Sequence, residues 1–320
     1  MQLSTIYEPV QEDLARVKNS LRLSSEVDFS QLSELLGYSL GDGKGIRSAL
    51  TLLSGKFYNY DLDCLLPAAT AVELMHTATL VHDDTIDKSL IRRGRPTVNR
   101  VWGEDKAVLL GDYLFAKAGE RATTTGSLRV VRLFVQTIMT ISSGELNQAF
   151  NAFNLGQTRD DYFQRVYKKT ASLFALSTES GAILSQAPEE SIEVLRGYGC
   201  NLGIAFQIVD DILDFVGTEE ELGKPVGSDL AQGTLTLPAM LLLESYPGDN
   251  PVKRLFQNRD EQKNISLAID LIRNSSIVQE CYKIASDYCS KACHDLSLLP
   301  DNANRRALVQ LADYIISRKK

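Results

Sequence analysis

Hydrophobic positions recur every three or four residues along most of the chain, which places them on one face of an α-helix. The first such stripe, within residues 5–25, consists of Ile6, Val10, Leu14, Val17 and Leu21, and we expect a partner helix or a second subunit to cover it. Similar spacing predicts helices over residues 32–40, 67–87, 106–123, 128–153, 159–186, 192–215 and 235–245, and three more between 250 and 320, the last at 305–319. No hairpin signal is visible, so the sequence predicts one all-α domain spanning residues 1–320.

Two of the predicted helices end in the same acidic pattern, Asp-Asp-x-x-Asp. The first copy carries Asp83, Asp84 and Asp87, and the second carries Asp210, Asp211 and Asp214. On a helix, the first and last aspartates of each copy lie about 40° apart on one face. One copy is typical of a solvated helix end, but two copies behind apolar segments point to a shared site. Mg²⁺ prefers such oxygen ligands and usually bridges them to substrate phosphates.

Basic side chains lie close to both acidic segments. Gly41–Ser48 is glycine-rich, and it brings Lys44 and Arg47 to the start of a helix, where the helix dipole also attracts anions. The other candidates are His76, Arg92, Arg93, Lys169 and Lys224. Taken alone, a loop with such cations is equally typical of a solvated surface. Together they exceed what one diphosphate needs, so we expect two diphosphates to bind.

Acidic and basic side chains beside apolar helices suit the loss of a diphosphate from an apolar chain. Mg²⁺ and cations would stabilise the departing charge as the C–O bond breaks. The carbocation left behind would need oriented dipoles, for which Thr170 and Gln207 are candidates. No Ser-His-Asp or Cys-His arrangement is visible, and this chemistry needs none.

Composition narrows the class of protein further. The chain has 320 residues, 44% hydrophobic and 23% charged, as in soluble globular proteins. Its net charge of −7 argues against a general nucleic-acid-binding surface. No apolar run approaches the ~18 residues of a membrane span, no signal peptide is evident, and the five cysteines do not suggest a disulfide framework. We therefore expect a cytoplasmic protein without a transmembrane segment.

These features together resemble the trans-isoprenyl diphosphate synthase family, particularly its long-chain polyprenyl diphosphate synthase branch. The resemblance covers nearly the whole chain and rests on Gly43–Arg47, Glu73–His76, Val81–Asp87, Arg92–Gly94, Gly111–Asp112, Lys169–Thr170, Gly203–Asp214 and Gly223–Asp229. It implies a helical bundle of the isoprenoid synthase type around a central cavity. It also implies a Mg²⁺-dependent prenyltransferase that condenses an allylic diphosphate with isopentenyl diphosphate, head to tail. A homodimer, three Mg²⁺ ions per active site and product release at a membrane surface are further expectations.

The resemblance also assigns roles to individual residues. Direct metal ligands are Asp83, Asp87 and Asp210, and Asp84, Asp211 and Asp214 support them, often through water. The allylic diphosphate is held by Arg92, Lys169 and Lys224, and isopentenyl diphosphate by Lys44, Arg47, His76 and Arg93. Thr170 and Gln207 face the developing cation, and the released diphosphate is the expected base for the final proton loss.

Three positions depart from the family pattern. The family usually has arginine at position 45 and proline at 48, and often lysine at 234, where this chain has Gly45, Ser48 and Thr234. The two lost cations predict weaker binding at one substrate site, with catalysis retained because all six aspartates are present.

Product length depends on the residues one and two turns before Asp83. Met75, Ala78 and Thr79 lie toward the apolar end of this helix, and large aromatic side chains there would close the channel early. Because Ala78 and Thr79 are small, we expect a product of about C30 or longer, with the C20 product of a geranylgeranyl diphosphate synthase as the main alternative. Phe134 and Ile138 are candidates for the floor of the channel.

Two other functions fit part of the pattern. A class I terpene cyclase also ionises a diphosphate with Mg²⁺, but it needs no second diphosphate site, so Lys44, Arg47 and His76 favour the synthase. A regulatory subunit of a heteromeric synthase is the non-enzyme alternative, which Gly45 and Thr234 keep open. Such subunits commonly lose one acidic segment, and both are intact here.

Overall fold

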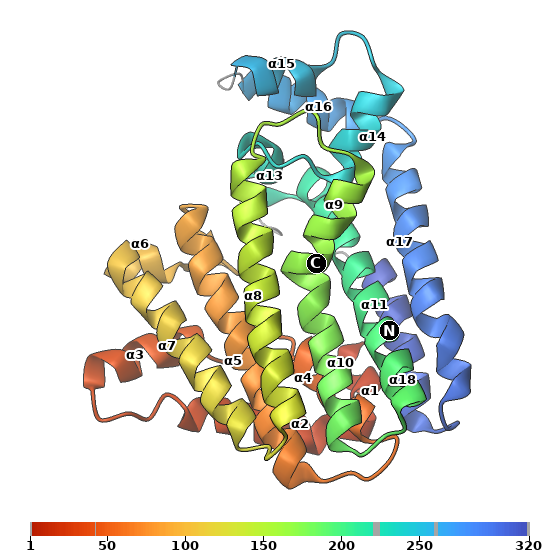
Figure 1. The fold of residues 1–320 in the computed structure, drawn as a ribbon. Helices are drawn as coiled ribbons and strands as arrows, with labels where there is room; N and C mark the ends of the chain where they lie inside the picture. Colours follow the sequence, from red (N-terminus) through yellow and green to blue (C-terminus); the bar gives the residue numbers. More distant parts are fainter. Residues whose placement is uncertain (1, 42, 220–224, 259–261, 319–320) are drawn as a thin grey trace.

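A computed structural model describes residues 2–41, 43–219, 225–258 and 262–318, and these are almost entirely helical (Figure 1). The helices are α1 (Leu3–Ile6), α2 (Gln11–Leu23), α3 (Ser30–Ser39), α4 (Ile46–Gly55), α5 (Leu62–Ile86), α6 (Val98–Trp102), α7 (Glu104–Thr123), α8 (Leu128–Phe150), α9 (Arg159–Val166), α10 (Ser172–Leu184), α11 (Glu189–Val216), α13 (Ser228–Ala231), α14 (Leu237–Ser245), α15 (Pro251–Asn258), α16 (Gln262–Arg273), α17 (Ile277–His294) and α18 (Ala303–Ser317). The remaining elements are the 3-10 turns η1 (Glu8–Val10) and η3 (Asp295–Leu298), the π-helical turn η2 (Tyr167–Ala171), and the strands β1 (Ile91–Arg92) and β2 (Arg95–Pro96). The predicted all-α class is confirmed.

Helix α5 is the central element, and it packs against α2, α4, α7 and α10. Asp61 caps its start by accepting a hydrogen bond from the backbone of Asp63. The helix is long and apolar enough to cross a membrane by length and composition, yet 56% of the apolar window is buried inside this protein. Helix α5 is long enough to extend from the edge of the bundle to the first acidic segment, which lies at the C-terminal end of the helix.

Two hydrophobic clusters make up the core. The first joins α2, α4, α5, α7 and the N-terminal part of α8 to α10 and α18. The second lies around α14, α15, α16 and the first half of α17, at the top of Figure 1. Helix α11 contributes to both clusters, with Leu202 in the first and Ile212 in the second. This helix therefore spans both halves of the core, and its C-terminal part, which contains the second acidic segment, lies in the second cluster.

Several predicted boundaries were wrong. The stretch from 5 to 25 is divided into α1, η1 and α2. Its apolar stripe is buried by the chain's own helices, which confirms the partner-helix alternative. Pro67 lies inside α5 rather than at its start, because Asp61 supplies the cap. The predicted helix at 159–186 is interrupted by η2, and residues 250–320 hold four helices in the described part instead of three.

The loop between 88 and 96 contains a short antiparallel hairpin that the sequence did not indicate. Arg92 pairs with Arg95, and the two residues between them, Arg93 and Gly94, both have positive φ (52° and 75°). That combination is typical of a two-residue type I′ turn. Each strand is only two residues long, which is too short for an alternating pattern to show in the sequence.

Candidate active site

The six aspartates divide into accessible and buried side chains. Asp83, Asp87 and Asp210 reach solvent, whereas Asp84, Asp211 and Asp214 are buried. This is the same division as between the residues expected to ligate metal directly and those expected to support them. Each buried carboxylate has a partner within the protein, so it can position its helix end.

The buried aspartates tie the acidic helix ends to neighbouring elements. Asp84 accepts a hydrogen bond from Nε of Arg92 on β1 (2.7 Å). Asp211 accepts from the hydroxyl of Tyr162 on α9 (2.7 Å) and from the Gln207 amide (2.8 Å). Asp214 accepts from Ser228 Oγ at the start of α13 (2.9 Å). Arg92, expected to hold the allylic diphosphate, is therefore paired with an aspartate in this structure.

The π-helical turn η2 lies beside the ends of both acidic helices. A π-helical turn inside a helix is often found at a functional site, and this one presents Lys169 and Thr170. Thr170 Oγ1 donates to Gln207 Oε1 (2.6 Å), three residues before Asp210. Lys169 Nζ pairs with Glu145 on α8 (2.7 Å), and the charge of Asp83 also acts on it. Lys169 is thus close to the first acidic segment, and Thr170 contacts the helix that carries the second.

Two glycines allow this close approach. At Gly144 on α8, a Cβ atom would lie 2.8 Å from the Lys168 side chain. At Gly203 on α11, a Cβ atom would lie 2.6 Å from Cα of Ala171. Such distances are shorter than real contacts, so both positions require glycine. The two glycines let α8 and α11 pack directly on η2 and so determine where Lys169 and Gln207 lie.

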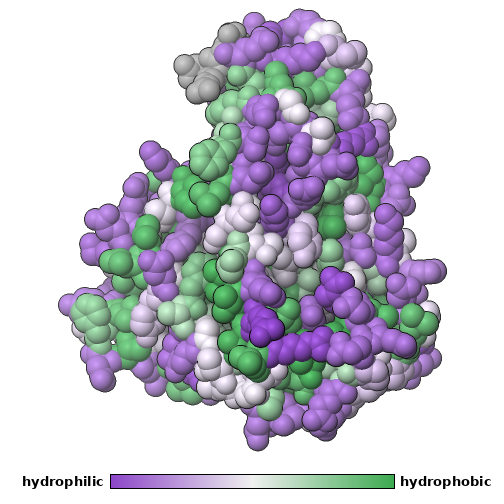
Figure 2. Space-filling model, viewed as in Figure 1, coloured by the Kyte–Doolittle hydropathy of each residue, from purple (hydrophilic) through white to green (hydrophobic). Residues whose placement is uncertain are grey.

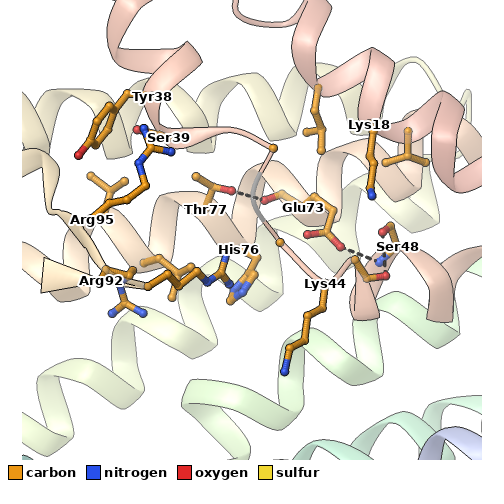
Figure 3. A pocket seen from close by; sticks show the side chains of 18 of the residues that line it. Lys18, Tyr38, Ser39, Lys44, Ser48, Glu73, His76, Thr77, Arg92 and Arg95 are labelled. Atoms are coloured by element: carbon orange, nitrogen blue, oxygen red, sulfur yellow. Dashed lines mark hydrogen bonds between the residues drawn. The ribbon is translucent and has the colours of Figure 1, made fainter. Parts of the chain in front are cut away.

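A cavity of about 650 Å³ contains most of the predicted co-substrate residues. Its lining includes Lys18, Lys44, Glu73, His76, Arg92 and Arg95 (Figure 3). Arg93 and Asp84 line it as well. Burial and the charges of Arg47, Arg93 and Arg92 hold the pKa of His76 well below its usual range. His76 is therefore neutral at pH 7 among cations, which is the electrostatic environment of an anion site.

Arg47 lies behind this cavity instead of on its wall. Its guanidinium is buried, with Cζ 4.7 Å from the centre of the Phe174 ring. Burial, opposed by the charges of Glu73 and Asp210, lowers its pKa to about 10, so it stays charged at neutral pH. Glu73 accepts a hydrogen bond from the backbone of Ser48 (2.9 Å) and so fixes the start of α4 (Figure 3).

Three further predicted residues lie elsewhere. Met75 and Ala78 are buried, Thr79 is half-buried, and none of the three lines the cavity of the co-substrate set. Their proposed contribution to product length stays a prediction. Lys224, predicted to hold the allylic diphosphate, lies outside the described residues.

The acidic residues fit a hard divalent cation. Burial raises the pKa of Asp83 to about 7, with Glu145 and Asp87 adding to the shift and Lys169 and Arg92 opposing it. One buried oxygen of Asp84, Oδ1, has no hydrogen-bond partner. Excess negative charge and an unpaired carboxylate oxygen are what a hard cation would relieve. Within the described residues no three potential ligands are close enough to hold a metal by themselves, so the metal role of the six aspartates stays a prediction.

Four residues of the site were missed by sequence reasoning. Tyr162 holds Asp211, Glu145 and Gln148 hold Lys169, and Arg318 at the end of α18 pairs with Asp210 (2.6 Å). Arg318 and Asp210 are 108 residues apart, and Tyr162 and Asp211 are 49 apart. Only the buried environment implied by the apolar pattern around Tyr162 could have suggested a partner for its hydroxyl.

The raised pKa values predict how the metal-free protein responds to pH. Burial, with a contribution from Asp229, also raises the pKa of Asp211 to about 7. A folded-state pKa above the ordinary value of 3.8 means that the folded protein binds the proton more tightly, so the stabilisation is present at low pH and is lost as pH rises toward 7. With EDTA present, we expect the melting temperature to fall by about 5 °C between about pH 5 and pH 8. Circular dichroism melts would measure this.

Asp211→Asn should flatten that pH dependence. The control Asp63→Asn changes an exposed carboxylate in the first turn of α5 and should leave the pH dependence as it is in the wild type. Mg²⁺ should reduce the loss in the wild type because it compensates the carboxylate charge. Parallel profiles for the wild type and Asp211→Asn would contradict the prediction.

Comparison with known proteins identifies the family of the chain. A sequence profile of the polyprenyl synthetase family matches residues 29–272. The heptaprenyl diphosphate synthase component 2 of Geobacillus stearothermophilus is 38% identical, with 99% of each chain aligned. The crystal structure of heptaprenyl diphosphate synthase from Staphylococcus aureus is 37% identical and superposes with a TM-score of 0.92, covering 97% of this chain and 99% of that one. A polyprenyl synthase from Caulobacter crescentus, solved with calcium and isoprenyl diphosphate, is 32% identical with a TM-score of 0.95 and coverage of 100% and 98%.

Proposed function

Because the chain belongs to the polyprenyl synthetase family, we propose that it is a Mg²⁺-dependent prenyltransferase that condenses an allylic diphosphate with isopentenyl diphosphate, head to tail. The observation that carries this proposal is the pairing of two different sites. One is the cationic cavity around His76, and the other is the pair of acidic helix ends on either side of Lys169. A prenyltransferase needs both, because one substrate keeps its diphosphate and the other loses it.

The accessible aspartates and Lys169 would act on the allylic substrate. Asp83, Asp87 and Asp210 are the residues that would hold Mg²⁺, which when bound supplies charge stabilisation for the departing diphosphate. Lys169 stays protonated because Glu145 and Asp83 outweigh the effect of burial, and together they raise its pKa. Its ammonium group can therefore bind a diphosphate oxygen as negative charge develops there.

Thr170 and Gln207 would stabilise the carbocation left by ionisation. The Thr170 hydroxyl donates a hydrogen bond to the Gln207 side-chain oxygen, and the Gln207 amide nitrogen donates one to Asp211. This fixed orientation leaves lone pairs of the Thr170 oxygen, and not a proton, to face positive charge. Preorganised dipoles of this kind cost no reorganisation at the moment of reaction.

The cationic cavity would hold isopentenyl diphosphate by its diphosphate. Lys44 and Arg93 carry charge, and neutral His76 can donate one hydrogen bond without adding another positive charge. Gly45 has positive φ (65°) where it caps α4, so the arginine usual at this position in the family would be strained here. Weaker co-substrate binding through the loss of this cation stays a prediction.

The decisive experiment assays the purified chain alone. With Mg²⁺, farnesyl diphosphate and radiolabelled isopentenyl diphosphate, we expect label to enter an acid-labile lipid product, and EDTA should abolish incorporation. Conversion of farnesyl diphosphate without incorporation of label would identify a terpene cyclase instead.

A heteromeric synthase is the second candidate, because the relative from Geobacillus stearothermophilus is named component 2 of its enzyme. In that case the chain alone would incorporate little label, and a different subunit would restore activity. The same assay, with and without a co-expressed partner, separates the two proposals.

The surface of α8 supports a homodimer. Leu128, Val135, Met139, Leu146 and Phe150 follow one another at spacings of seven and four residues, and each is 52–86% exposed. This is the spacing of one helix face, and green hydrophobic patches lie among white and purple ones over α8 in Figure 2. Exposed Val108 and Leu109 on α7 extend the surface. Five exposed apolar side chains on one helix face are unusual on a monomer, and a second copy of the chain would bury them symmetrically.

Met139→Glu is expected to convert this dimer to monomers, because it places a charge in the middle of the apolar strip. Size-exclusion chromatography with light scattering would measure the change from the mass of two chains to that of one. Leu298→Glu changes an equally exposed residue on η3, away from the strip, and should leave the dimer intact. A monomeric wild type would rule the homodimer out.

Product length, the number of Mg²⁺ ions, the cytoplasmic location, release at a membrane surface and the single-domain organisation of residues 1–320 stay predictions. The names of the relatives, heptaprenyl and octaprenyl diphosphate synthases among them, support a long-chain product. We propose about C30 or longer.

A further inference from the structure

Phe174 lies at the contact between the two substrate sites. It is on the first turn of α10, four residues after Thr170, and it is fully buried. The Arg47 guanidinium lies 4.7 Å from the centre of its ring, and the ring of Phe206 on α11 lies 5.1 Å away, tilted by 45°. No residue role predicted from the sequence involves Phe174.

The ring of Phe174 is held in place from several sides. Two glycines of α11 pack directly on this residue: a Cβ atom at Gly199 would lie 2.6 Å from its carbonyl oxygen, and one at Gly203 would lie 3.0 Å from its Cβ. Phe206 in turn has the Arg318 guanidinium 3.8 Å above its ring, and Arg318 pairs with Asp210. The glycine contacts hold the backbone and Cβ of Phe174 against α11, and the Phe206 ring packs on the Phe174 ring, so Phe174 offers Arg47 a fixed surface.

An aromatic contact fixes a guanidinium differently from a hydrogen bond. The interaction is between the cation and the face of the ring, so it uses none of the N–H donors of the arginine. Arg47 Nε is buried and has no hydrogen-bond partner. The ring fixes the plane of the guanidinium behind the cavity wall without occupying any of its donors, so that a diphosphate reaching Arg47 meets a group that is already oriented.

We propose that Phe174 is a positioning residue of the co-substrate site, whose ring holds the Arg47 guanidinium in place while leaving its N–H groups available to the diphosphate. The proposal rests on the proposed function, in which Arg47 binds isopentenyl diphosphate. It adds that the precision of this contact comes from an aromatic residue on α10, the helix that directly follows the π-helical turn presenting Thr170. Phe174 touches neither metal nor reacting carbon in this account, so its effect should be specific to one substrate.

Phe174→Leu is the primary test. It retains an apolar side chain and removes the ring face, so we expect the KM for isopentenyl diphosphate to rise about tenfold. The KM for the allylic diphosphate should change by less than about twofold, because Lys169 and the acidic segments are untouched. Phe57→Leu is the matched control: Phe57 is a buried phenylalanine of the same hydrophobic cluster, and its loss should lower the melting temperature without changing either KM.

A double-mutant cycle separates positioning from a general structural role. If Phe174 acts through Arg47, then Phe174→Leu should have little further effect on KM in an Arg47→Gln background. Additive effects would overturn the proposal, and so would an unchanged KM in Phe174→Leu when Arg47→Gln raises it; the proposed function would stand in both cases. An unchanged KM in Arg47→Gln would instead remove Arg47 from the substrate site, and the role of Phe174 with it.

Folding of the variants is checked by circular dichroism. If Phe174→Leu does not fold, Phe174→Met provides a side chain of closer volume without a ring, and the same rise in KM is expected. Equal losses for both substrates in a folded variant would show that Phe174 only fills space and would contradict the proposal.

Discussion

Replacing Asp83 by asparagine is expected to slow condensation by about a thousandfold or more. Asp83 is half-buried near the end of α5, and the charges of Lys169, Glu145 and Asp87 act on its carboxylate. Asparagine keeps the shape of the side chain but removes the negative charge that a hard cation requires. Incorporation of labelled isopentenyl diphosphate at saturating Mg²⁺ would measure the loss.

The same substitution should stabilise the metal-free protein slightly at neutral and higher pH. Burial raises the pKa of Asp83 to about 7, so ionising this carboxyl opposes folding when no cation is bound. Loss of activity together with an equal or higher melting temperature is typical of a residue retained for function. Asp63→Asn, at the opposite end of the same helix, should change neither quantity. Retention of more than about a tenth of the activity in Asp83→Asn would argue against direct metal ligation.

Ala78→Phe is expected to shorten the product to about C20 or less. Ala78 is fully buried in α5, five residues before Asp83, where the growing chain must pass if it extends from the metals toward the apolar end of the helix. A phenyl ring at this position would occupy the path. Chromatography of the dephosphorylated products would show the change in length.

A second substitution makes the prediction sharper. Ala71 is also fully buried and lies seven residues earlier on nearly the same helix face, ~10 Å further from the metals. Ala71→Phe should therefore give a product longer than that of Ala78→Phe and shorter than that of the wild type. Because a phenyl ring in a packed core also destabilises, Ala78→Val and Ala78→Leu complete a graded series. Identical products from the wild type and every variant would place the channel elsewhere.

The structure also changes how the two predicted diphosphate sites relate to each other. Arg92 was expected at the allylic site, yet it pairs with Asp84 and lines the same cavity as His76 and Arg93. Arg47 was expected beside them, yet it lies behind the cavity on Phe174. Asp84 engages Arg92 through Nε, which leaves its terminal N–H groups for a diphosphate, whereas Arg47 is held on a ring without using its Nε.

The sequence by itself determined the helical class and the two acidic segments. Helical periodicity is a local property of the sequence. Because α8 and α11 are each buried on one face, their apolar residues recur at helical spacing and predict these helices directly. The repeated Asp-Asp-x-x-Asp pattern needed no structure to suggest two halves of one site. The sequence also identified the basic segments Gly43–Arg47 and Arg92–Gly94, but it did not show which side chains they contact.

Tertiary structure alone decided which residues meet. The pairing of Arg318 with Asp210, the contact of Tyr162 with Asp211 and the stacking of Arg47 on Phe174 all join distant parts of the chain. Local periodicity cannot report such contacts, because they depend on how closely the helices pack. The π-helical turn at Lys169 has the same origin, since α8 and α11 approach it through Gly144 and Gly203. The sequence therefore identified the chemical groups of the site, and the packing of the helices determined their geometry.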